Sequence, residues 1–123
     1  MISYGVYKIL HIVGIAGVIL SLGGLTLFAL SENGKTPAHR KLAMITHGVG
    51  LLITFVAGFG LMARIGLVSS SWPAWIYGKL AIWLLLGVSP TLIKRRPQQA
   101  SVLWWAFLVL VALAAWLANY KPL

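Results

Sequence analysis

Three ionisable side chains of this sequence lie well inside long apolar segments: His11, His47 and Lys79. An ionisable group at such a position is costly to bury, and it therefore indicates a functional site. The groups that usually accompany a catalytic histidine are scarce, because the sequence has no cysteine and one acidic residue, Glu32, in a polar segment. This composition excludes thiolate metal sites, cysteine nucleophiles, paired carboxylates and triads with an oriented aspartate. Any chemistry must use the remaining polar side chains, methionine or a bound cofactor.

The spacing of His11 and Lys79 predicts that they share one layer. Each lies seven residues after the aromatic residue that begins its segment, Tyr4 or Trp72. At ~1.5 Å per residue, both are about 10 Å from the outer end of a helix. An inward-facing Lys79 would suit an acidic ligand group such as a carboxylate or a haem propionate. The alternative is that Lys79 extends along its helix to the membrane interface, which its long stem permits.

His47 and Met62 are further candidates for cofactor binding. His47 is offset from His11 by about 10 Å along a helical bundle, which disfavours joint ligation of one haem. Met62 is closer to His11 in depth and is an acceptable second axial ligand, although methionine in an apolar helix more often serves packing. For His47, the alternative is a hydrogen bond to Ser21 or Thr54 across the bundle.

The elements that position these residues are four apolar segments, and they predict a membrane protein. Hydrophobic residues make up 60% of the 123 residues and charged residues 9%, against about 45–50% and about 25% in soluble domains. The segments cover roughly 4–30, 42–65, 72–93 and 100–119. Each can cross a ~30 Å hydrocarbon core as a helix. Short connections predict one all-α domain over residues 1–123, an integral-membrane, antiparallel up-down four-helix bundle.

The charge distribution predicts the orientation in the membrane. Ten lysines and arginines give a net charge of +9, but they lie between apolar runs and form no solvated face for nucleic acid. The positive-inside rule places the first and third loops in the cytoplasm and both termini outside a bacterial-type inner membrane. We expect these loops to contact anionic lipid headgroups, and the first segment, longer than a signal-peptide core, to be retained. The bases of these loops are Lys35, Arg40, Lys41, Lys94, Arg95 and Arg96.

Small residues predict where the helices pack. In the first segment Gly14, Gly17, Ser21 and Gly24 recur at spacings of three and four, so they form a stripe that a neighbouring backbone can approach. A similar stripe in the second segment contains His47 and Gly50. Pro90 predicts a kink in the third helix. Aromatic residues gather toward the outer ends of the segments, as in an interfacial belt: Tyr4, Tyr7, Trp72, Trp75, Tyr77, Trp116 and Tyr120.

Short motifs at three places resemble a known family. Lys8-Ile9-Leu10-His11, Lys79-Leu80 and the terminal Lys121-Pro122-Leu123 resemble HemJ-type protoporphyrinogen oxidases and small four-helix families of the CopD and SirB kind. The resemblance implies binding of haem b or a related tetrapyrrole, with His11 as the haem ligand and Lys79 as a functionally important residue. After the first helix the family has an aromatic, arginine-containing segment that ends in histidine, whereas this shorter chain reads Leu-Thr-Leu-Phe-Ala-Leu-Ser over 25–31. This difference favours a tetrapyrrole-binding fold over oxidase activity.

Two functions of different classes follow. The first is a redox protein that binds haem b or a related tetrapyrrole. The second is a non-catalytic small subunit or scaffold, which packs into a homo-oligomer or a larger membrane complex through its glycine stripes and six tryptophans. Transport of a small anion or a metal has less support, because four short helices enclose little volume.

Overall fold

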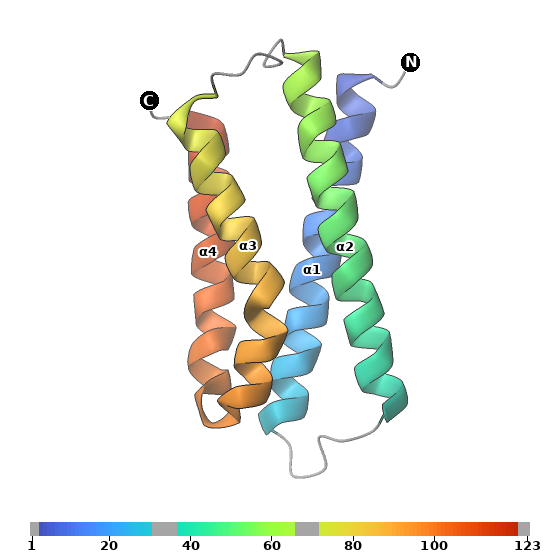
Figure 1. Ribbon diagram of the computed structural model, residues 1–123, viewed down its shortest axis with the longest axis vertical. Coiled ribbons are helices and arrows are strands. Elements are labelled where there is room, and N and C mark those ends of the chain that lie inside the picture. The colour runs from blue at the N-terminus through green and yellow to red at the C-terminus, as the bar shows by residue number, and fades with distance from the viewer. Residues whose placement is uncertain (1–2, 31–36, 66–71, 121–123) are drawn as a thin grey trace.

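A computed structural model describes residues 3–30, 37–65 and 72–120, and these residues are almost entirely helical (Figure 1). The elements are α1 (Tyr4–Leu30), α2 (Pro37–Arg64), α3 (Ala74–Arg95), the short 3-10 helix η1 (Pro97–Gln99) and α4 (Ala100–Tyr120). The four α-helices are each long and apolar enough to cross a membrane. The prediction of an all-α chain with four such helices is confirmed for the described residues.

Two helix boundaries differ from the prediction because of proline. We expected α2 to begin at residue 42, but it begins at Pro37 and includes Arg40 and Lys41. Proline is tolerated in the first helical turn, where its missing N–H has no intrahelical partner. We expected Pro73 just inside the third helix, but it is the N-cap residue, with an extended ψ of 155°.

The helices form an elongated bundle with α1 beside α2 and α3 beside α4 (Figure 1). The start of α1 and the end of α4 lie at one end of the bundle, which we name the terminal end. The opposite end, where α2 begins and α3 ends, carries Arg40, Lys41, Lys94, Arg95 and Arg96. We name it the basic end.

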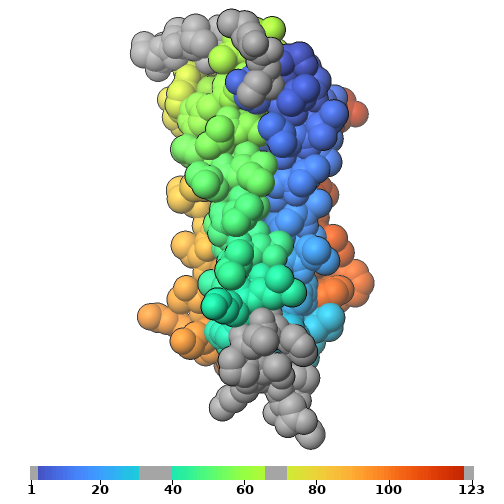
Figure 2. All heavy atoms as spheres, turned by 90° about the vertical axis from the view of Figure 1, so that its right-hand side faces the viewer, coloured from blue at the N-terminus to red at the C-terminus, as the bar shows by residue number. Residues whose placement is uncertain are grey.

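Glycine allows α1 and α2 to pack backbone against backbone. A Cβ atom added to Gly50 would lie 2.8 Å from the Gly14 carbonyl oxygen and 2.9 Å from the Val18 nitrogen, and one added to Gly14 would lie 2.8 Å from the Thr54 nitrogen. Backbone atoms of two packed helices cannot move aside, so only glycine fits at these two positions. The space-filling view shows α1 and α2 side by side on one face of the bundle (Figure 2).

The predicted packing stripe is wrong at Gly24. A Cβ atom at Gly24 would have no atom within 4 Å, and the same holds for Gly48 of α2. The stripe is therefore packed from Gly14 to Ser21, which is 3% exposed, and open at Gly24.

The core of the bundle is small and apolar, with its polar groups satisfied. It joins all four α-helices through residues such as Leu22, Ala43, Leu86 and Phe107. Buried hydroxyls donate to carbonyls of their own helices, as Thr26 does to Leu22 and Ser89 to Leu85. Among the described residues, no buried side-chain nitrogen or oxygen lacks a hydrogen-bond partner.

Candidate functional site

His11 of α1 is held by α2. Its Nδ1 lies 3.0 Å from the carbonyl oxygen of Thr54, and its ring covers Gly58, where an added Cβ would lie 3.3 Å from Cε1. A carbonyl oxygen can only accept, so Nδ1 must carry the proton and donate it. In the neutral ring, this leaves the lone pair on Nε2, which can act as a metal ligand.

Lys79 of α3 belongs to the same site. Its side chain is half-buried, as is that of His11, and it lies near enough for its positive charge to act on the imidazole. The two residues that were expected to share a layer are thus within electrostatic range of each other. The only acidic residue of the sequence, Glu32, lies outside the described residues.

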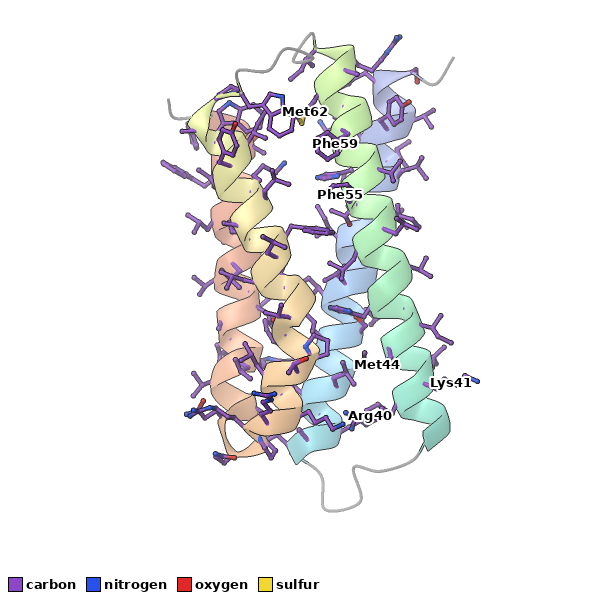
Figure 3. All side chains as sticks on the ribbon, viewed as in Figure 1. Arg40, Lys41, Met44, Phe55, Phe59 and Met62 are labelled. Atoms are coloured by element: carbon purple, nitrogen blue, oxygen red, sulfur yellow. The ribbon has the colours of Figure 1, made fainter. Side chains whose placement is uncertain are left out.

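Aromatic side chains connect α2 with α3 beside this pair. The ring of Phe55 lies 4.8 Å from those of Phe59 and Trp83, measured between centroids, and the Phe59 ring lies 5.6 Å from that of Trp72. Figure 3 shows Phe55, Phe59 and Met62 on the side of α2 that faces α3. Sequence reasoning missed this cluster, although the spacing of four and three residues along α2 places the three side chains on one face.

Met62 is offset from the His11 ring. It lies four residues beyond Gly58, the residue that the ring covers, and therefore about 6 Å further along α2. Its half-buried side chain shares the face of Phe55 and Phe59. Met62 thus adjoins the aromatic cluster, one turn closer to the terminal end than the imidazole.

His47 has a different partner from the one expected. It is 4% exposed, and its Nε2 donates to the carbonyl oxygen of Leu86 in α3 at 3.0 Å. In an uninterrupted α-helix that oxygen would accept from the N–H of residue 90. Residue 90 is proline, which has no N–H, so the Leu86 carbonyl needs a donor from outside its helix. His47 supplies this donor and thereby stabilises α3 at Pro90.

The expected hydrogen bonds from His47 to Ser21 or Thr54 are therefore wrong. Both hydroxyls donate within their own helices at 2.7 Å, from Ser21 to Val18 and from Thr54 to Gly50. Thr54, which accepts from His11, lies seven residues from His47 along α2, a rise of about 10 Å. The two histidines occupy separate layers, and His47 is engaged in holding α3.

A second hydrogen bond between these helices has its donor on α3 and its acceptor on α2. The indole Nε1 of Trp83 donates to the carbonyl oxygen of Leu51 at 3.1 Å. Trp83 lies one turn after Lys79 on α3, so the face that carries Lys79 is directed toward the α1–α2 pair. No group of three or more histidine or acidic side chains suited to a metal ion occurs within the described ranges.

No protein-family model matches the chain, and no solved structure matches it. The chain is similar to the UPF0397 protein VS_II0189 of Vibrio atlanticus, with 27% identity over an alignment of 116 residues. The alignment covers 87% of this chain. The match covers 62% of that protein, so the chain spans less than two thirds of the length of this relative.

Proposed function

We propose that this protein binds haem b or a related tetrapyrrole within the membrane and serves a redox role, with His11 as the axial ligand. The observation that carries the proposal is the hydrogen bond from His11 Nδ1 to the Thr54 carbonyl. Histidines that ligate metals usually donate their other ring N–H to a backbone carbonyl or a carboxylate, which fixes the tautomer and raises the basicity of the ligating nitrogen.

The surroundings of His11 suit such a group. A tetrapyrrole already surrounds its metal with four nitrogens, so one protein histidine is enough to hold it. Lys79 places positive charge beside His11 and suits a propionate carboxylate, and Phe55 and Trp83 offer flat apolar surfaces. A bound haem would supply one-electron chemistry. The protein residues would orient it, pair with its carboxylate and exclude water, and Met62 remains a candidate second ligand.

An absorption spectrum tests this proposal. Protein purified in detergent should show a Soret band that shifts on addition of dithionite, and His11→Ala should lose it. Lys79→Met should retain the band but weaken haem binding by about tenfold, the effect of one charge-assisted hydrogen bond. Lys8→Met is the matched control, because it removes an exposed lysine of α1. A Soret band that persists in His11→Ala would remove the proposed ligand.

We further propose that the four helices cross the inner membrane as an antiparallel bundle with both termini outside. The exposed large side chains of all four helices are mostly apolar, and the basic end suits the cytoplasmic face. Because the sequence has no cysteine, a single introduced cysteine is the one thiol that can be labelled, and its labelling reports the side of the membrane on which it lies. In intact cells, Tyr120→Cys should react with an impermeant maleimide and Arg95→Cys should not; the reverse pattern would contradict this orientation.

One observation supports the alternative, a non-catalytic subunit of a larger membrane complex. The described part of α4 buries only Ala100 and Phe107, and it leaves Trp105 and Val109 about two thirds exposed. This apolar face suits a partner helix as well as lipid. Stoichiometric co-purification with other membrane proteins, together with no Soret band, would favour this function over the first.

A further inference from the structure

A groove runs between α1 and α2 at the basic end, on the other half of the bundle from His11. Its volume is about 310 Å³, at the lower end of the range for ligand pockets, ~300–1,000 Å³. It exists because the glycine contacts that join α1 and α2 stop before Gly24, which has no atom within 4 Å of an added Cβ. Its lining includes Leu20, Ser21, Gly24 and Phe28 of α1 with Leu42 and Thr46 of α2.

The groove presents an almost purely apolar surface. Its two hydroxyl groups are already used, because Ser21 donates to the Val18 carbonyl at 2.7 Å and Thr46 to the Leu42 carbonyl at 2.8 Å. Neither hydroxyl has a proton left to donate to a ligand. The groove therefore suits a flexible hydrocarbon chain better than a polar molecule.

Positive charge lies at the end of the groove. Arg40 and Lys41 immediately precede the lining residue Leu42, and both are exposed. Arg40 extends toward the lower end of α1, whereas Lys41 points away from the bundle (Figure 3). An arginine binds a phosphate oxygen pair through two parallel hydrogen bonds. An apolar groove that ends at such an arginine matches the two parts of an anionic phospholipid.

We propose that this groove holds one acyl chain of an anionic phospholipid, with the headgroup phosphate on Arg40. The proposal rests on the membrane insertion proposed above and is independent of the tetrapyrrole. It goes beyond a general attraction of basic loops to lipid, because it assigns one lipid to one groove. The lipid would fill the space that α1 and α2 leave open below their glycine contacts.

Native mass spectrometry of the detergent-purified protein tests the groove with a matched pair of glycines. Phosphatidylglycerol and phosphatidylcholine with identical acyl chains are added in turn. We expect the protein to retain one phosphatidylglycerol and at least tenfold less phosphatidylcholine, because the choline ammonium of phosphatidylcholine neutralises the phosphate charge that would pair with Arg40. Gly24→Leu adds a side chain to the groove lining at a position where the new Cβ meets no atom within 4 Å, and it should lower retention by about tenfold, because several methylene groups lose their contact. Gly48→Leu, at an open position outside the groove lining, should leave retention unchanged.

A second matched pair tests the headgroup. Arg40→Gln should reduce retention of phosphatidylglycerol to the level of phosphatidylcholine, whereas Lys41→Gln should change it less than twofold. Equal retention by Gly24→Leu and Gly48→Leu, or equal retention of the two lipids by the unaltered protein, would overturn the proposal. A dimer that Gly24→Leu dissociates would assign the groove to a second copy and would also overturn it. Release of the protein from membranes by alkaline carbonate would show instead that membrane insertion fails.

Discussion

The interface between α1 and α2 is built differently from the interface between α2 and α3. Gly14 and Gly50 bring the backbones of α1 and α2 together, with space for no side chain at either position. Between α2 and α3, the contacts include long side chains that donate to backbone carbonyls, from His47 to Leu86 and from Trp83 to Leu51. The first interface depends mainly on shape and has one such hydrogen bond, from His11 to Thr54, whereas the second depends on hydrogen bonds in an apolar setting.

The difference bears on the candidate site, because His11 belongs to the first interface. The Thr54 carbonyl accepts the hydrogen bond from its ring, and Gly58 leaves space for the ring. Both residues lie on α2, as does Gly50. The close packing of α1 on α2 thus fixes the imidazole, while α3 brings Lys79 to it. A substitution in the glycine interface should disturb both the fold and His11, whereas one at His47, in the α2–α3 interface, should affect mainly the fold.

The largest effect is expected from Gly50→Val. The new side chain would meet the backbone of α1, so the helices must separate, at a cost of about 3 kcal/mol in the free energy of unfolding. Thermal or denaturant unfolding in detergent measures this loss. Gly48→Ala is the control, because its Cβ meets no atom within 4 Å, and it should be neutral or stabilise by up to ~1 kcal/mol through helix propensity. Equal stability of the two variants would contradict the close approach.

A smaller effect is expected from His47→Leu. The substitution leaves the Leu86 carbonyl without a donor, and a buried unsatisfied carbonyl costs about 1–3 kcal/mol. Pro90→Ala would restore an N–H that can reach this oxygen from within α3. In the Pro90→Ala background, therefore, His47→Leu should cost at least ~1 kcal/mol less than in the unaltered protein. Additive effects in this double-mutant cycle would contradict the link between Pro90 and His47.

The smallest effect is expected from Trp83→Phe. It removes the indole donor and keeps an aromatic ring beside Phe55, while the Leu51 carbonyl can still accept within uninterrupted α2. The loss should be about 0.6 kcal/mol, the average for a side-chain hydrogen bond in a membrane protein. The same unfolding assay measures it. A loss larger than that of His47→Leu would show that the indole bond is the stronger connection between α2 and α3.

Much of this arrangement could be predicted from the sequence, because apolar length and helical rise are local properties. They located the four helices within a few residues and placed His11 and Lys79 at equal depth. The partner of His47 could not be predicted in this way. Pro90 marks the Leu86 carbonyl as needing a donor, but which residue reaches it depends on the register between α2 and α3. The open space at Gly24 could not be predicted either, because the divergence of α1 from α2 depends on the packing of the whole bundle.

The contrast between the two histidines provides the most direct test of the proposed function. Haem is titrated into the purified protein and into His11→Gln and His47→Gln, and the Soret band is recorded. Glutamine keeps an amide donor for the Thr54 or Leu86 carbonyl but lacks the imidazole nitrogen. We predict that His47→Gln binds haem like the unaltered protein and that His11→Gln loses the band. A band retained in His11→Gln and lost in His47→Gln would contradict the assignment of His11 as the ligand.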